Sequence, residues 1–204
     1  MQEEKEKKLI PSFLKYALII ALVAILAALF LAVYQSNYEA MKDITINNEL
    51  KDAYSVSTDI RTHAVEDEFS GNGGFYGYSL YYIEEAGYVQ FCVKYNTNQI
   101  SKLKDQYPAL SGIDFILRDS EGNEYKPTVI GREAKFHYVY LKLEYRFDEG
   151  EYDFNKQDLI ARMIIKGVDY DFDSEGFNDL IIHKKGEASI PYELSKKEME
   201  AINN

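Results

Sequence analysis

The chain lacks tryptophan and holds a single cysteine among its 204 residues. One cysteine, Cys92, cannot close a disulfide within the chain, so the fold has to rest on its apolar core. The absence of tryptophan argues against a sugar site built on ring stacking. Basic side chains are in the minority too, since the chain has 23 lysines and arginines but 34 aspartates and glutamates. Because an acidic surface repels phosphate backbones, we expect no nucleic-acid partner.

Motifs for catalysis or cofactor binding are missing as well. The glycine-rich stretch 70–74 lacks the lysine and the following helix that a phosphate cradle requires. No serine stands in a nucleophile elbow, and Cys92 falls inside an expected strand with no base signalled nearby. We therefore expect a non-enzymatic protein without a cofactor. A surface hydrolase with no recognisable motif is an alternative, although nothing singles out a pair of catalytic carboxylates.

A long apolar run is the strongest signal in the chain. Residues 16–34 contain no charge, and as a helix they span roughly 28 Å, close to the ~30 Å hydrocarbon core of a bilayer. A small-x-small cleavage site is missing near the end of the run, and no cysteine follows it for lipid attachment. We predict an uncleaved transmembrane helix that contacts the lipid bilayer through residues 16–34. A signal peptide or a buried helix of a soluble core is the alternative.

Lysines on either side of this run predict its orientation. Four lysines lie before it, at positions 5, 7, 8 and 15, whereas Lys42 and Lys51 are the basic residues in the next twenty positions. By the positive-inside rule, the N-terminus is cytoplasmic and the rest of the chain is extracytoplasmic. Tyr16 and Tyr34 at the ends of the run suit the aromatic belt of a membrane interface.

Small side chains recur on one side of the predicted membrane helix. Ala17, Ala21, Ala24 and Ala28 follow one another at spacings of four, three and four, which places them on one helix face. A face of small residues lets a second helix approach closely, so it is a candidate contact for a homodimer. The alternative is that alanine is simply common in such segments.

Beyond residue 50 the hydrophobic pattern has period two. Strands are expected at 54–60, 75–83, 88–95, 113–118, 124–130, 135–147, 159–166 and 180–183, of which 159–166 is apolar at most positions and therefore central. Helical signals are confined to residues 98–106 and to a capping box from Ser195 to Glu198. We predict a mainly β fold, in which an N-terminal transmembrane helix precedes an antiparallel immunoglobulin-like β-sandwich. The expected boundaries are 1–15 for a cytoplasmic tail, 16–34 for the transmembrane helix, 35–50 for a juxtamembrane stalk, 51–190 for the β-sandwich and 191–204 for a tail with a short helix.

Two segments carry a family resemblance. Residues 89–98 form a strand that ends near an asparagine, and residues 115–125 follow the pattern Phe-x-Leu-x-Asp-x-x-Gly-x-x-Tyr. Together they resemble the immunoglobulin-like extracellular domains of Gram-positive envelope proteins and lipoproteins, over about 40 residues. The resemblance implies a sandwich fold and brings no catalytic residues. The chain departs from that family in having a helical anchor instead of a lipidated cysteine.

The acidic loop 171–179 is the sharpest candidate for a metal site. Asp171, Asp173 and Glu175 place carboxylates at alternate positions, and a glycine follows at the sixth, as in a calcium loop. Ile182 then stands where the bidentate glutamate belongs, so a solvated acidic turn is the alternative. The three histidines have no partner at ligand spacing, and we expect no zinc site.

Tyrosines gather in the stretch from 76 to 88. Tyr76, Tyr78 and Tyr82 fall on one side of an expected strand and would form a partner-binding platform if that side is exposed. Core packing is the alternative.

The part of the chain after residue 34 carries 31 of the 34 acidic side chains and 19 of the 23 basic ones. We expect this acidic domain to bind a ligand or another envelope or membrane protein. A structural subunit of a membrane secretion or conjugation assembly is a second interpretation.

Overall fold

A computed structural model describes residues 12–40, 43–65, 67–71, 73–135, 137–148, 152–167 and 178–204. The chain divides into two compact units, residues 1–41 and residues 42–204. The acidic loop with Asp171, Asp173 and Glu175 lies outside the described residues.

The described part of the first unit is one helix, α1 (Ser12–Ala40). Its segment Phe13–Val33 is long and apolar enough to cross a membrane, and its side chains are exposed. The helix continues past the apolar run as far as Ala40, so the first part of the expected stalk is helical. At about 1.5 Å per residue, its 29 residues extend roughly 44 Å, which exceeds the hydrocarbon core of a bilayer.

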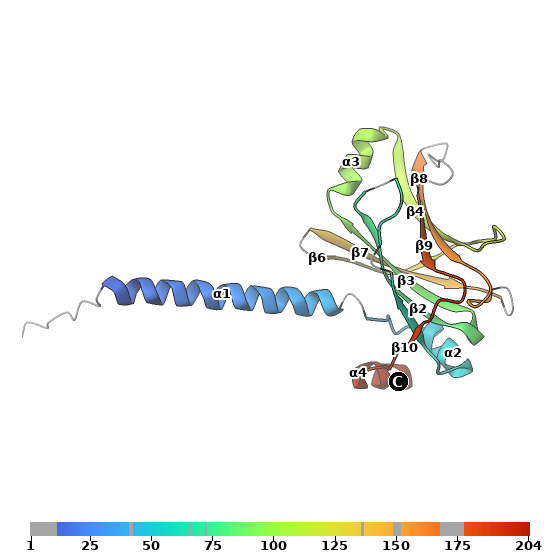
Figure 1. The fold of residues 1–204 in the computed structure, drawn as a ribbon, viewed down its shortest axis with the longest axis horizontal. Helices are drawn as coiled ribbons and strands as arrows, with labels where there is room; N and C mark the ends of the chain where they lie inside the picture. The colour runs from blue at the N-terminus through green and yellow to red at the C-terminus, as the bar shows by residue number, and fades with distance from the viewer. Residues whose placement is uncertain are drawn as a thin grey trace, which may run out of the picture. The chain divides into compact units, whose positions relative to one another are not determined.

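The described strands of the second unit form two antiparallel sheets (Figure 1). The first sheet has the order β10 (Ile190–Pro191), β1 (Arg61–Ala64), β2 (Phe75–Ile83), β3 (Tyr88–Asn96), β7 (Tyr138–Arg146) and β6 (Thr128–Lys135). The second has the order β5 (Glu124–Tyr125), β4 (Leu110–Arg118), β8 (Leu159–Gly167) and β9 (Asp179–His183). The remaining elements are the helices α2 (Asn48–Val56), α3 (Gln99–Gln106) and α4 (Lys196–Asn203) and the 3₁₀ turn η1 (Glu84–Ala86). The prediction of a mainly β fold after an apolar helix is confirmed.

The main core lies between the two sheets. Alternate residues of β3 supply one side of it, as the period-two pattern predicts: Val89, Phe91, Val93 and Tyr95 all belong to this core. Leu117, Ala161 and Met163 from β4 and β8 belong to the same cluster on the other side. Each side chain removed from water stabilises the fold in proportion to its buried apolar area, at roughly 25 cal/mol per Å².

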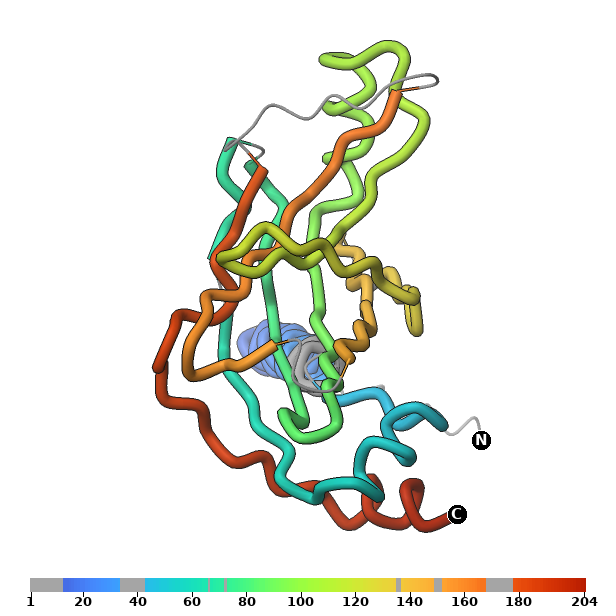
Figure 2. The backbone as a smooth tube through the Cα atoms, turned by 90° about the vertical axis from the view of Figure 1, so that its right-hand side faces the viewer, coloured from blue at the N-terminus to red at the C-terminus, as the bar shows by residue number. Residues whose placement is uncertain are grey.

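A second apolar cluster covers the other face of the first sheet. Leu50 and Ala53 of α2 pack there with Tyr81, Ile83 and Tyr88, and Ile202 of α4 packs against the same group. Figure 2 shows α2 and α4 together at the same end of the domain. As a result β2 and β3 are buried on both faces, which the alternation in their sequences did not predict.

The predicted strand at 54–60 is wrong, because α2 occupies residues 48–56. Asn47 begins this helix by accepting a hydrogen bond from Leu50 N at 2.9 Å, which satisfies one of the free N–H groups of the first turn. Leu50 and Ala53, three residues apart, then turn to the same buried side. The cap and this helical spacing outweigh the short alternation that follows them.

The predicted return strand 124–130 is divided between the sheets. Its first two residues form β5 beside β4, whereas β6 begins at Thr128 in the first sheet, beside β7. Pro127 lies between them, and a proline has no N–H with which to continue a ladder. The chain therefore leaves one sheet and joins the other at this residue.

Candidate functional site

A groove of about 400 Å³ opens between the sheets beside α3. We call it the α3 groove and define it by the residues that line it: Phe75, Tyr95, Ile100, Lys104, Leu110, Ser111, Gly112, Ile113, Phe115, Arg132 and Leu141. Its volume lies within the range of small-molecule sites. Three aromatic rings, those of Phe75, Tyr95 and Phe115, are buried there and form its apolar floor.

Local sequence explains how α3 comes to lie beside this floor. The β3 strand ends at Asn96, whose side-chain oxygen accepts a hydrogen bond from Asn98 N at 2.9 Å and turns the chain into the helix. Leu103 then points into the main core. The helix ends at Gln106, the next residue Tyr107 caps it by donating its N–H to Leu103 O, and Pro108 follows. The helix thus carries the chain from the first sheet to β4 of the second.

The aromatic floor is held by strand pairing. Phe75 and Tyr95 are opposite each other in the β2–β3 register, and their rings stack with centroids 5.0 Å apart. Phe115 comes from β4 of the opposite sheet and packs against Phe69 at 5.6 Å. Residues of both sheets therefore fix the floor in place.

A β-bulge interrupts β4 where this strand lines the groove. The register shifts between Leu110 and Gly112. Gly112 pairs with Lys166, so its open side, where a Cβ atom would meet nothing within 4 Å, lies on the outer face of the sheet. Ser111 is committed to the neighbouring strand, since its hydroxyl donates to Lys166 O and Gly167 O.

Among the described residues, two cations and no acid line the α3 groove. Lys104 belongs to α3 and Arg132 to the edge strand β6, and both side chains are exposed. Neither makes an ion pair with any residue in the described part of the chain. In a protein of net charge −11, this is a local reversal of sign.

A smaller, acidic pocket of about 170 Å³ lies at the other end of β2. Asp59, Glu84, Glu85 and Glu187 line it with one arginine, Arg61, which pairs with Asp59 at 2.9 Å. Burial and the nearby Asp153 and Glu85 carboxylates raise the pKa of Glu84. The pocket therefore holds surplus negative charge, opposite in sign to the α3 groove.

Two of the three histidines meet beside this acidic pocket. The rings of His63 and His183 have centroids 6.2 Å apart, and His63 Nε2 lies 3.5 Å from a Glu187 oxygen. Burial lowers the pKa of His183, whose Nε2 lies 3.1 Å from Phe154 O. Sequence spacing missed this pair, because β1 and β9 bring together residues 120 positions apart. Among the described residues, no three His, Cys, Asp or Glu side chains are placed to hold a metal ion.

The tyrosine platform is not exposed. Tyr78 is 4% exposed and Tyr82 is 3% exposed, whereas Tyr76 is half-buried. Tyr82 stacks on Phe154 with centroids 3.8 Å apart. A β-bulge between Gly77 and Ser79 changes the phase of the strand, so the expected single face does not exist. These tyrosines serve the packing of the domain.

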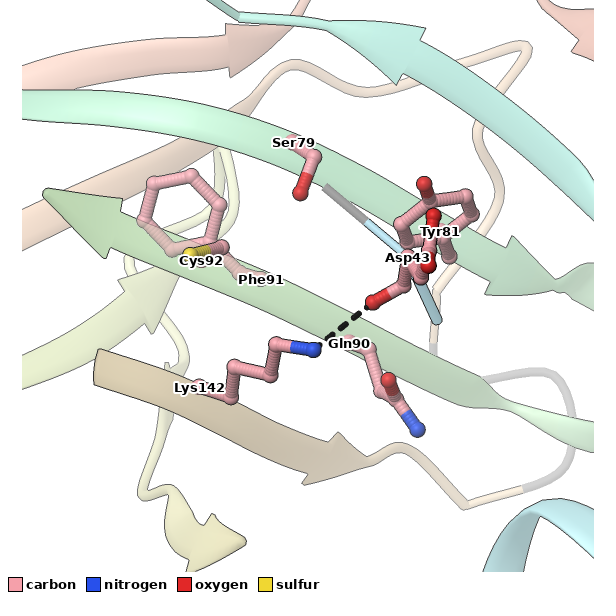
Figure 3. A pocket seen from close by; sticks show the side chains of 7 residues that line it. All are labelled: Asp43, Ser79, Tyr81, Gln90, Phe91, Cys92 and Lys142. Carbon is pink, nitrogen blue, oxygen red and sulfur yellow. Dashed lines mark hydrogen bonds between the residues drawn. The ribbon is translucent and has the colours of Figure 1, made fainter. Parts of the chain in front are cut away.

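A very small cavity lies on the outer face of the first sheet (Figure 3). Its volume of about 10 Å³ has room for about one water molecule, so it is not a ligand site. Lys142 Nζ reaches across it and donates to Asp43 O at 2.8 Å. Burial raises the pKa of the adjacent Cys92 to about 12, so its thiol is not a nucleophile near neutral pH.

The alanines at 17, 21, 24 and 28 all lie within α1, and each is exposed along the helix. No protein family, curated protein or solved structure matches this chain.

Proposed function

We propose that this protein is a single-pass membrane protein whose domain after α1 is an extracytoplasmic, non-enzymatic binding module, with the α3 groove as its binding site. One observation carries the proposal. The α3 groove is a ligand-sized hollow with an aromatic floor, in a domain whose other apolar surfaces are largely closed by packing. A hollow of this size lined by aromatic and aliphatic side chains is typical of ligand sites.

The excess of lysine before the apolar run supports the extracytoplasmic placement. A reporter enzyme that is active only outside the cytoplasm, fused after Asn204, tests it directly. We expect activity from that fusion and none from the same reporter fused before residue 1. The reverse result would contradict the orientation.

The proposal also includes an immunoglobulin-like scaffold. Two antiparallel sheets that enclose one core, with a chain crossing between them at Pro127, support this part. Scaffolds of this type hold binding residues on connections between fixed strands. The α3 connection between β3 and β4 is such a place.

A neutral apolar probe tests whether the α3 groove binds at all. Full-length protein in nanodiscs of zwitterionic lipid is titrated with 2-naphthylmethanol, and ligand-observed NMR reports binding above that of empty nanodiscs. We expect saturable binding that Ile100→Trp abolishes, because Ile100 lines the groove and the larger indole ring occupies it. The control Gly131→Ala adds a methyl group beside Lys142, outside the groove, and should bind like the parent. Equal binding by the parent and Ile100→Trp would remove the groove as the site.

A further inference from the structure

We infer that the α3 groove takes a small organic anion: an apolar, ring-sized body that carries one carboxylate, sulfonate or phosphate group. The inference rests on the proposed function and adds the chemical class of the ligand. It joins three properties of the groove, namely its size, its aromatic floor and its two cations.

The floor defines the apolar half of the ligand. Phe75, Tyr95 and Phe115 present ring surfaces from three strands, and Ile100 and Ile113 flank them half-buried. An aromatic or short aliphatic group placed there gains burial on several sides and offset ring contacts. A hollow of about 400 Å³ accepts one such group and is too small for a folded element of a partner.

The two cations define the charged half. Lys104 and Arg132 reach the groove from different elements, and no carboxylate among the described lining residues opposes them. An arginine binds a carboxylate or phosphate through two parallel hydrogen bonds, and a lysine adds a point charge. At physiological salt the Debye length is about 8 Å, so the acidic remainder of the domain is largely screened from an anion held between them.

Charge elsewhere in the domain sharpens this selectivity. The acidic pocket holds Asp59, Glu84, Glu85 and Glu187 at the opposite end of β2. An organic cation is therefore attracted to that end and away from Lys104 and Arg132. The α3 groove, in contrast, is the place where an anion meets two cations without ion-pair partners in the described structure.

Three probes with one apolar body test the inference: naphthalene-2-carboxylate, 2-naphthylmethanol and 2-naphthylmethylammonium. Each is titrated against the full-length protein in zwitterionic nanodiscs, with Ile100→Trp as the blank. We expect the carboxylate to bind about tenfold more tightly than the alcohol, as one charge-assisted hydrogen bond provides. The ammonium probe should bind most weakly, and added salt should weaken the binding of the carboxylate probe alone.

Charge-neutral variants locate the preference. Lys104→Gln and Arg132→Gln should each lose part of the tenfold preference for the carboxylate, and the double variant should lose all of it while still binding the alcohol. Lys102→Gln is the matched control, since Lys102 lies on the same helix outside the groove.

The outcomes separate the two proposals. Equal affinity for carboxylate and alcohol, or a preference that survives in the double variant, overturns the anion inference and leaves the α3 groove as a binding site. If none of the three probes binds saturably, the proposed function itself is overturned. The assignment to a small ligand is overturned if an acidic peptide that bears the same naphthyl group binds more tightly than the three probes. It is also overturned if the protein self-associates and the double variant loses this self-association.

Discussion

The side chain of Gln90 forms hydrogen bonds with both the N–H and the C=O group of Thr45. The Thr45 N–H donates to Gln90 Oε1 at 2.8 Å, and Gln90 Nε2 donates to Thr45 O at 2.7 Å. Gln90 is the third residue of β3 and is 4% exposed, while Thr45 is the fifth residue after the end of α1. The pair fixes the stretch of chain that enters the domain. Asn47 adds a second point, since its Nδ2 donates to the buried Glu144 at 2.7 Å.

Replacing Gln90 tests this attachment. Gln90→Leu leaves the partly buried N–H and C=O of Thr45 without their partner, so we expect the free energy of unfolding to fall by about 1–3 kcal/mol. Amide hydrogen exchange of residues 43–47 should accelerate at the same time. Gln106→Leu, at an exposed position of α3, is the control and should change stability by less than about 0.5 kcal/mol. Similar exchange of residues 43–47 in both variants would mean that Gln90 does not fix this segment.

Gly77 sets how closely the two sheets approach. A Cβ atom at this position would lie 2.6 Å from Leu180 Cδ2 and 2.7 Å from Val65 Cγ1, and both of those side chains are buried. We expect Gly77→Ala to destabilise the domain by about 1–3 kcal/mol through overpacking, measured by urea denaturation. Gly131→Ala meets only ordinary contacts and should be nearly neutral.

A double variant distinguishes crowding from other effects of the alanine. Leu180→Ala removes the nearest atom, so Gly77→Ala should cost less in that background than alone. Strictly additive free energies would show that the methyl group at residue 77 does not contact Leu180.

His183 makes the stability of the domain depend on pH. Burial lowers its pKa in the folded state, although the Phe154 carbonyl and Glu187 act in the opposite direction. Its contribution to stability is therefore complete above the unfolded-state pKa of about 6.5, and it is lost as the pH falls below that value and through the lowered folded pKa. Melting temperatures between pH 7.5 and 5 should show this loss in the parent protein.

A variant isolates this contribution. His183→Gln keeps a donor for the Phe154 carbonyl and cannot titrate, so its stability should change less between pH 7.5 and 5 than that of the parent. His137→Gln, at an exposed turn position, should retain the parental dependence. Parallel pH profiles for the parent and His183→Gln would exclude His183 as the source.

Local signals in the sequence predicted the β2–β3 hairpin well. Gly87 suits the left-handed position of its turn and has φ 57° there, with no room for a side chain, because a Cβ would lie 2.2 Å from Phe147 O. The alternation of β3 and the capping box at Ser195 also appear as predicted, since each depends on residues within a few positions of one another. The wrong strand at 54–60 arose because the decisive signal, the Asn47 cap, lies outside that stretch.

The α3 groove was beyond sequence reasoning for a physical reason. Lys104 and Arg132 lie 28 positions apart on a helix and an edge strand, and neither stands in a motif. They share a groove only because the chain changes sheets at Pro127, which places β6 in the first sheet. The register shift of β4 between Leu110 and Gly112 also lies beside the groove, and the alternation of the sequence does not predict it.

The alanine face of α1 predicts self-association within the membrane. Ala17, Ala21, Ala24 and Ala28 lie within about 60° of one another around the helix at 100° per residue, so a second copy can pack closely along this face. Ala21→Leu together with Ala24→Leu adds bulk at its centre, and we expect the helix to lose most of its self-association in a membrane two-hybrid reporter. Ala27→Leu is the control, because it changes the same residue type on a neighbouring side of the helix. Unchanged reporter activity in the double variant would show that the helix does not associate through its alanines, and it would remove the support that this face gives to a role as a subunit of a membrane assembly.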